Sequence, residues 1–148
     1  MKVYQVLFVV CLLVVSVKAF VQRSQGLARA HTARATSPLR MVLEVPEGDY
    51  EKEVVEASKS KPVLVDFWAI WCGPCRLVAP LMDKVQEEFG EDAIKVVKVD
   101  TVVHKDTVQR YKLEGLPRLI IFKDGEPVAS HEGALPYAKL QEFVKGAL

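Results

Sequence analysis

A nearly continuous apolar run, Val63–Trp68, constrains the fold of this chain more than any other segment. A short apolar run without polar alternation is typical of a strand that is buried on both faces, and such a strand lies in the middle of a sheet. Pro62 precedes the run, and a helical pattern follows it over residues 76–89. A central strand that leads into a helix predicts an α/β domain.

Strand and helix patterns continue to alternate along the rest of the chain. Strands are predicted over residues 41–45, 94–99, 119–122 and 127–131, and helices over residues 49–59, 103–111 and 137–148. Pro80 lies inside the helix predicted over 76–89, and we expect it to kink that helix. The sequence Lys-Asp-Gly-Glu at residues 123–126 is typical of a hairpin turn. This order of elements predicts a three-layer α/β/α sandwich with a central mixed sheet.

Charge divides the chain into two parts. Residues 1–40 hold six of the 20 Lys and Arg residues, and the first acidic residue is Glu44. Residues 41–148 hold the other 14 basic residues together with all 19 Asp and Glu, so this part is net acidic. Nucleic-acid binding needs Lys and Arg clustered on the folded surface. The charge therefore argues against nucleic acid as a partner, and the length leaves room for one ordinary domain.

The first 40 residues have the composition of two targeting signals in series. Residues 3–17 form an uncharged run rich in Val and Leu, which predicts a signal peptide over residues 1–19. A membrane anchor is the alternative, although a span needs about 20 apolar residues. Residues 20–40 contain four Arg and no acid, a composition typical of a transit peptide. The two segments resemble the bipartite presequences of algae with complex plastids, so we expect delivery to the plastid stroma.

Redox chemistry is predicted at residues 71–75, Trp-Cys-Gly-Pro-Cys. The motif lies where the buried strand gives way to a helix, and the N-terminus of a helix stabilises a thiolate, the form of cysteine that attacks a disulfide. Cys72 is the predicted nucleophile, and Cys75, one turn inward, is the predicted resolving thiol. We expect Gly73 to permit the tight turn and Pro74 to fix the backbone at the first helical position, where its missing N–H costs nothing.

Two alternatives compete with redox use of this cysteine pair. A zinc site would need two further ligands, but His104 and His131 are 27 residues apart, far from zinc-finger spacing. Two inert buried cysteines are the other alternative, and the flanking Trp71 with the intervening Gly-Pro favours redox use over it. Because Cys11 lies in the predicted signal peptide, the mature domain has too few cysteines for a structural disulfide framework. No metal site is predicted.

Residues 65–76, Val-Asp-Phe-Trp-Ala-Ile-Trp-Cys-Gly-Pro-Cys-Arg, resemble the active-site segment of thioredoxins. The similarity continues over roughly residues 44–148 and implies the thioredoxin fold for a domain over residues 41–148. Within it, residues 122–136 are similar to the plastid y-type branch, with the m-type branch as the rival. The resemblance implies a protein-disulfide reductase that carries electrons as a reversible Cys72–Cys75 dithiol, without a bound cofactor.

The resemblance also implies a groove that binds the target protein beside the disulfide. The residues that match the family's groove are Leu116, Pro117, Gly133 and Ala134, with Leu116-Pro117 as a cis-proline loop and Gly133 in a glycine-bearing loop. Trp71 is either a core aromatic or, beside an exposed thiol, a residue that flanks the groove, and we expect the second. One residue departs from the family pattern, because Arg118 follows the proline where thioredoxins usually have Thr. We expect its guanidinium at the rim of the groove, either reaching a carboxylate on a target protein or pointing into solvent.

An acidic residue, Asp66, interrupts the buried strand six residues before Cys72. Desolvation should raise the pKa of this carboxyl and keep it partly protonated, unless it lies at a strand end in water. In thioredoxins the matching Asp accepts a proton from the resolving cysteine, so the resemblance implies this role for Asp66 toward Cys75. Lys98 matches the family's lysine near that Asp, although as a sequence feature it is equally a solvated strand residue.

The resemblance further implies partners. In a plastid they would be a ferredoxin-dependent thioredoxin reductase as electron donor, and peroxiredoxins or methionine sulfoxide reductases as targets. We expect a monomer without stable membrane association after processing. Two rival functions remain. The first is an oxidase or isomerase that is located in the secretory lumen or is secreted, and the second is a non-catalytic interaction module. Pro74 argues against the first, because oxidising relatives usually have His there, and the presence of both Cys72 and Cys75 argues against the second.

Overall fold

The computed structural model describes residues 42–148, so the predictions on residues 1–41, including the signal and transit peptides, lie outside the described residues. A five-stranded sheet of order β1-β3-β2-β4-β5 forms the middle of the domain. Its strands are β1 (Leu43–Glu44), β2 (Val63–Trp68), β3 (Lys95–Asp100), β4 (Arg118–Lys123) and β5 (Glu126–Glu132). β3 runs parallel to both β1 and β2, whereas β4 is antiparallel to β2 and to β5. The sheet is therefore mixed, as predicted.

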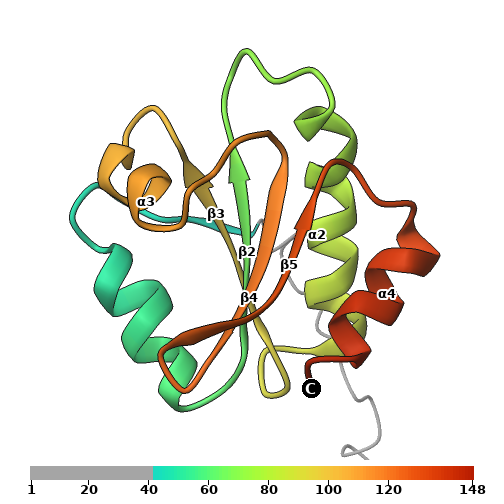
Figure 1. Cartoon of the computed structure of the whole chain (residues 1–148). Coiled ribbons are helices and arrows are strands. Elements are labelled where there is room, and N and C mark those ends of the chain that lie inside the picture. Colours follow the sequence, from blue (N-terminus) through green and yellow to red (C-terminus); the bar gives the residue numbers. More distant parts are fainter. Residues whose placement is uncertain (1–41) are drawn as a thin grey trace, which may run out of the picture. The chain divides into compact units, whose positions relative to one another are not determined.

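Helices cover both faces of this sheet, which confirms the three-layer prediction (Figure 1). On one face lie α2 (Cys75–Phe89) and α4 (Tyr137–Lys145). On the other face lie α3 (Lys105–Arg110) and a helical segment made of η1 (Glu51–Glu56) and η2 (Ala57–Lys59). No helix within residues 42–148 is long and apolar enough to cross a membrane.

The central strand β2 separates two apolar cores. Leu64 packs with Val78 of α2 and Leu140 of α4 in one core. Val63, Val65 and Phe67 pack in the other core with Tyr50, Val54, Phe122 and further apolar residues of β3 and β4. The first five residues of β2 are buried, so the strand is covered on both faces as its apolar run predicts. Because β2 is buried, its C-terminal end has a fixed position, and the cysteine motif at residues 71–75 follows soon after it.

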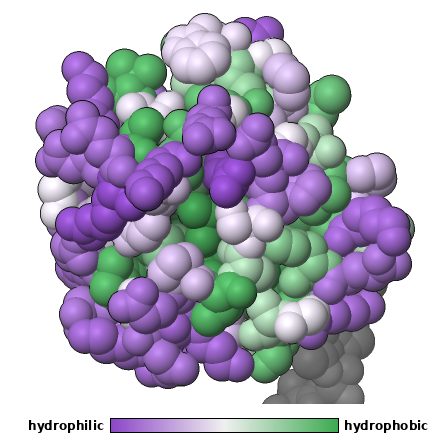
Figure 2. Space-filling model, viewed as in Figure 1, coloured by the Kyte–Doolittle hydropathy of each residue, from purple (hydrophilic) through white to green (hydrophobic). Residues whose placement is uncertain are grey.

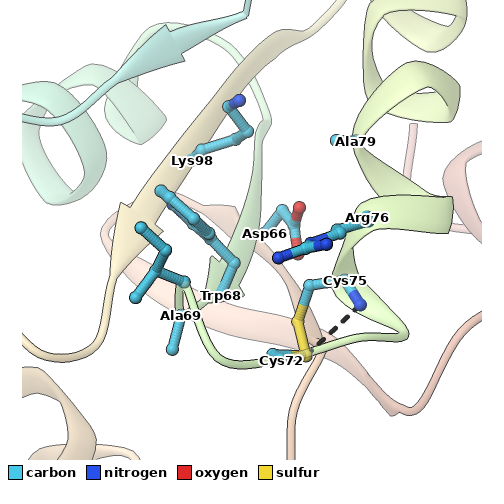
Figure 3. Close-up of a pocket in the computed structure, with 9 residues that line it drawn as sticks. Asp66, Trp68, Ala69, Cys72, Cys75, Arg76, Ala79 and Lys98 are labelled. Carbon is cyan, nitrogen blue, oxygen red and sulfur yellow. Dashed lines mark hydrogen bonds between the residues drawn. A yellow bond between two sulfur atoms is a disulfide. The ribbon is translucent and has the colours of Figure 1, made fainter.

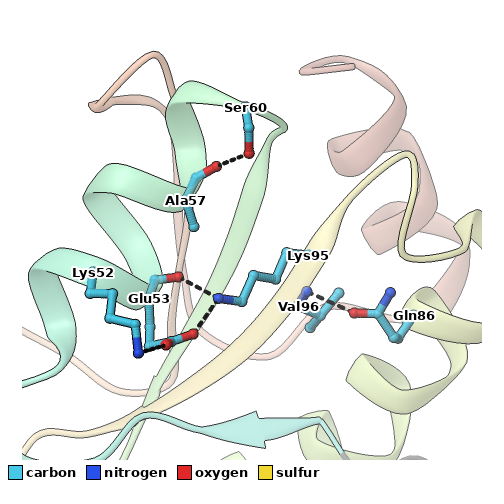
Figure 4. Close-up of polar contacts among 7 residues, drawn as sticks. All are labelled: Lys52, Glu53, Ala57, Ser60, Gln86, Lys95 and Val96. Carbon is cyan, nitrogen blue, oxygen red and sulfur yellow. Dashed lines mark hydrogen bonds and ion pairs between the residues drawn. The ribbon is translucent and has the colours of Figure 1, made fainter.

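The helix predicted over residues 49–59 forms with a different geometry. Residues of η1 make a π-helix and those of η2 a 3-10 turn, so no regular α-helix is present in this segment. A lysine ties the segment to the sheet, because Lys95 Nζ donates to the Glu53 carbonyl oxygen at 2.9 Å and to a Glu53 carboxylate oxygen at 2.5 Å (Figure 4). Tertiary contacts of this kind offset the poorer hydrogen bonding of irregular helical turns.

The exposure of Leu77 and the β4–β5 register differ from the sequence patterns. The apolar spacing of α2 predicts that Leu77 is buried, but it is 69% exposed. The buried face of α2 instead follows Val78, Met82 and Val85, so Met82 is fully buried. The hairpin turn forms as predicted, since Asp124 and Gly125 have φ values of 56° and 87°, the left-handed pair that a two-residue turn requires. A register shift lies in the β4–β5 pairing, and no local sequence signal indicated it.

β5 is an edge strand, and polar side chains dominate its exposed positions. Figure 2 shows hydrophilic side chains around this face, with smaller apolar areas between them. Glu126 and Glu132 are exposed at the two ends of β5, and Val128 between them is 52% exposed. Charged residues on an edge strand discourage pairing with the edge of another sheet.

Candidate active site

The cysteine pair lies at the junction of β2 and α2, as predicted. Cys72 and Cys75 form a disulfide with their Cα atoms 5.4 Å apart, and Cys75 is the first residue of α2. Pro74 precedes it with a helical backbone, φ −61° and ψ −29°, so the missing proline N–H costs no hydrogen bond there. Gly73 differs from the expectation, because its φ lies outside the left-handed region and an added Cβ would meet no atom within 4 Å. The turn itself does not require glycine.

The two sulfur atoms differ in their hydrogen bonding. The backbone N–H of Cys75 donates to Cys72 Sγ at 3.2 Å (Figure 3). Burial does not separate the two residues, since Cys72 is 4% and Cys75 3% exposed. A hydrogen bond to sulfur at a helix N-terminus stabilises the thiolate over the thiol. Cys72 is therefore the cysteine whose thiolate the backbone favours after reduction.

A buried carboxyl lies behind the disulfide. Asp66 is fully buried in β2, and neither of its carboxylate oxygens has a hydrogen-bond partner among residues 42–148. It lines a cavity of about 140 Å³ together with Cys72, Cys75 and Lys98 (Figure 3). Burial raises the pKa of Asp66 to about 7, and the positive charge of Lys98 opposes this rise. The predicted perturbation is confirmed, and the cavity is large enough to hold water between the carboxyl and the sulfur atoms.

Lys98 is the charged residue that faces this carboxyl across the sheet and lines the same cavity. In the parallel pairing of β2 with β3, Lys98 is opposite Asp66. Its ammonium group lies 5.8 Å from the centroid of the Trp68 ring, a cation–π geometry. Because the Asp66 oxygens have no hydrogen-bond partner among the described residues, Lys98 influences Asp66 as a nearby charge rather than as a direct donor.

Two loops from the far half of the chain meet beside the disulfide. The Leu116–Pro117 peptide is cis, and Leu116 packs against the cysteine pair. The Gly133 N–H donates to the Pro117 carbonyl oxygen at 2.8 Å, and Gly133 has a φ of 91°, which favours glycine. Ala134, the next residue, is exposed. The structure thus brings together the loops that the sequence analysis placed around one groove.

Exposed apolar side chains extend this groove on one side. Trp71 and Ile70 are each 71% exposed. Trp71 lines a hollow of about 430 Å³ with Val102, Leu113 and Leu116. Exposed apolar surface around a reactive group is typical of a site that contacts another protein. Val102 and Leu113 were not predicted, because each lies in a loop without a local motif.

Comparison with known proteins agrees with this geometry. The sequence profile of the Thioredoxin family matches residues 41–146. The chain belongs to the thioredoxin family. It is 43% identical over 124 residues to "Thioredoxin Y, chloroplastic" of Oryza sativa subsp. japonica, covering 83% of this chain and 73% of that protein. It is 39% identical over 109 residues to "Thioredoxin X, chloroplastic" of Arabidopsis thaliana, covering 72% of this chain and 58% of that protein. It is also 39% identical over 103 residues to "Thioredoxin C-2" of Corynebacterium nephridii, covering 70% of this chain and 93% of that protein.

This thioredoxin is a thiol–disulfide oxidoreductase that reduces disulfides in proteins. The family membership, the mixed sheet and the cysteine pair at disulfide distance all support that activity. Each turnover exchanges two electrons between the Cys72–Cys75 pair and a disulfide of another protein. The plastid-type resemblance of the sequence is likewise confirmed by its similarity to chloroplastic thioredoxins.

One predicted groove residue has a partner that the sequence analysis did not foresee. Arg118 begins β4, and its Nη1 lies 2.7 Å from Oε2 of Glu132. The Arg118 side chain is 25% exposed, so it neither extends freely into solvent nor stands unpaired at the rim. Glu132 lies in the segment that resembles the y-type branch, but its pairing with Arg118 follows only from its position opposite Arg118 in the β4–β5 pairing.

The two histidines of the zinc alternative lie apart from the cysteines. Nε2 of His104 lies 3.0 Å from the Val45 carbonyl oxygen, and His131 packs against the ring of Phe143. Neither histidine lines the cavity of the cysteine pair. Across residues 42–148, His, Cys, Asp and Glu form no cluster of three or more that could hold a metal ion.

Proposed function

We propose that Cys72 attacks the target disulfide and that Cys75 resolves the resulting mixed disulfide. The Cys72 thiolate bonds to one target sulfur, and the other target sulfur leaves as a thiolate that takes up a proton. The Cys75 thiolate then bonds to Cys72 Sγ, the bond from Cys72 to the target breaks, and the second target sulfur leaves as a thiolate that takes up a proton, which leaves the Cys72–Cys75 disulfide. The observation that carries this assignment is the hydrogen bond from the Cys75 N–H to Cys72 Sγ, which stabilises one thiolate selectively.

The proton on Cys75 must be removed before that cysteine can attack. Asp66 shares the cavity of the cysteine pair and has no other hydrogen-bond partner among the described residues. A carboxyl with a pKa of about 7 takes up and releases protons near neutral pH, where this step occurs. Asp66 therefore serves as the proton acceptor for Cys75, and Lys98 keeps part of the Asp66 population ionised.

The proposed location is the stroma of a complex plastid. Two of the relatives named above carry the word chloroplastic in their names, and residues 1–40 have the composition of a signal peptide, over 1–19, followed by a transit peptide, over 20–40. A ferredoxin-dependent thioredoxin reductase is then the electron donor. Peroxiredoxins and methionine sulfoxide reductases are the proposed targets, on the resemblance to the y-type branch.

A reductase-coupled insulin assay tests this assignment. Residues 41–148 are supplied with electrons either by ferredoxin and its thioredoxin reductase or by NADPH and its thioredoxin reductase. We expect faster insulin reduction with the ferredoxin system. Equal or faster reduction with the NADPH system would argue against the plastid donor. Failure of the dithiothreitol-reduced protein to reduce insulin would contradict the reductase activity itself.

A further inference from the structure

An ion pair joins the first residue of β4 to the last residue of β5. Arg118 and Glu132 are cross-strand neighbours, with 2.7 Å between Nη1 and Oε2. The Arg118 side chain is three-quarters covered, and its Nε is buried without a hydrogen-bond partner in the part of the chain that the structure describes. Water and salt screen such a covered cation less than an exposed one. Glu132 therefore holds the guanidinium in one place.

The same glutamate occupies the space beside a glycine of the cis-proline loop. A Cβ built on Gly115 would lie 2.6 Å from Glu132 Oε1 and 2.8 Å from Glu132 Cδ. Gly115 directly precedes Leu116, which packs against the cluster of Ala69, Cys72 and Cys75. The loop before β4 is thus in contact with the end of β5 through the Glu132 side chain and, at Pro117, through the Gly133 N–H.

This contact bears on the surface that meets the target. Gly115 and Leu116 line the hollow that Trp71 borders, whereas Arg118 and Glu132 line neither this hollow nor the cavity of the disulfide. Loss of the ion pair would therefore affect binding of the target by changing the position of the Gly115–Leu116 segment. The reacting sulfur atoms would keep their own hydrogen bond and their place at the start of α2.

We propose that Arg118 and Glu132 are positioning residues whose ion pair holds the Gly115–Leu116 segment in place for the target protein. The proposal rests on the reductase function and deepens it. The competing idea is that Arg118 attracts a carboxylate of the target. The two ideas make opposite predictions for removal of the Glu132 charge. If Arg118 attracts a carboxylate of the target, the freed guanidinium should bind an acidic target more tightly. If the pair positions the loop, its loss should weaken target binding.

The test compares Arg118→Thr and Glu132→Gln in residues 41–148 of this thioredoxin. Two synthetic disulfide peptides serve as substrates, one with Glu and one with Lys beside the disulfide. Because the Glu132 side chain is 48% exposed, loss of this ion pair corresponds to about twofold to fivefold in an equilibrium. We therefore expect both variants to raise KM by about that factor for both peptides, with kcat within about twofold of the parent.

Two further variants separate positioning from a general loss of structure. The charge swap Arg118→Glu with Glu132→Arg restores an ion pair and should recover most of the lost KM. Glu142→Gln breaks the exposed pair with Lys139 on α4 and should leave KM unchanged. Thermal unfolding of every variant identifies any that fails to fold.

Three results would overturn the proposal. The first is a lower KM of Glu132→Gln for the Glu peptide, which would support attraction of acidic targets by Arg118. The second is an unchanged KM in both single variants, and the third is a folded charge swap without recovery. A parent protein that reduces neither peptide would instead contradict the reductase function on which the proposal rests.

Discussion

Replacement of Asp66 by Asn should stabilise the fold, and more so at higher pH. The buried carboxyl has its pKa raised from 3.8 to about 7. Below pH 4 it is protonated in both the folded and the unfolded protein. Between pH 4 and pH 7 the unfolded chain loses the proton while the folded protein keeps it, so the parent becomes less stable as pH rises, and the loss is complete above pH 7.

The size of the effect follows from that difference in pKa. The raised pKa of Asp66 lowers the free energy of unfolding of the parent by about 4 kcal/mol at pH 8 and by about 2 kcal/mol at pH 5. Asn is close in shape and does not titrate, so Asp66→Asn removes this cost. Any fixed penalty for burying the amide is the same at both pH values. We therefore expect the variant to gain about 2 kcal/mol more over the parent at pH 8 than at pH 5.

Urea unfolding of the oxidised protein at pH 5 and pH 8 measures this gain. The matched control is Asp92→Asn, because Asp92 is exposed and its replacement should change the free energy of unfolding by about 0.5 kcal/mol or less at both pH values. An Asp66→Asn variant whose gain is equal at pH 5 and pH 8 would show that the pKa of Asp66 is not raised in the folded protein. The carboxyl would then be ionised in the folded protein at both pH values.

Two predictions concern catalysis and delivery. Asp66→Asn should slow release of the mixed disulfide near neutral pH, because Cys75 loses its proton acceptor; turnover equal to the parent from pH 6 to pH 8 in stopped-flow assays would leave Asp66 a purely structural role. Residues 1–40 fused to a fluorescent protein should reach a complex plastid, and deletion of residues 3–17 should leave the fusion in the cytosol. Retention in the endoplasmic reticulum, or secretion, would favour a lumenal protein.

The sequence predicted those elements whose signals are local. The strand Val63–Trp68 has the predicted bounds, because a nearly continuous apolar run bounded by Pro62 permits one burial pattern only. Helix ends were less accurate, as with α3, which spans Lys105–Arg110 where residues 103–111 were predicted. Caps and fraying decide such ends, and neither has a strong sequence signal. The irregular turns of η1 and η2 depend on contacts with β3 and the hairpin, which no local pattern reveals.

The same distinction holds for the active site. Cys72, Cys75 and Asp66 were recognisable because each lies on, or directly before, the strand-to-helix junction that the pattern identifies. The partner of Arg118 could not be recognised from the sequence, because Glu132 lies 14 residues away and the pair depends on the register of β4 with β5. The expectation that Gly73 provides conformational freedom also required the actual φ of the turn.

Trapping of the mixed disulfide tests whether Cys72 attacks the target and Cys75 releases it. Cys75→Ser and Cys72→Ser are each incubated with a disulfide-bearing target protein, and the products are separated without reductant and identified by mass spectrometry. Because the Cys75 N–H stabilises the Cys72 thiolate and Cys75 is needed for release, Cys75→Ser should accumulate an adduct through Cys72, and Cys72→Ser should accumulate none. Equal accumulation by the two variants, or an adduct through Cys75 alone, would contradict the account.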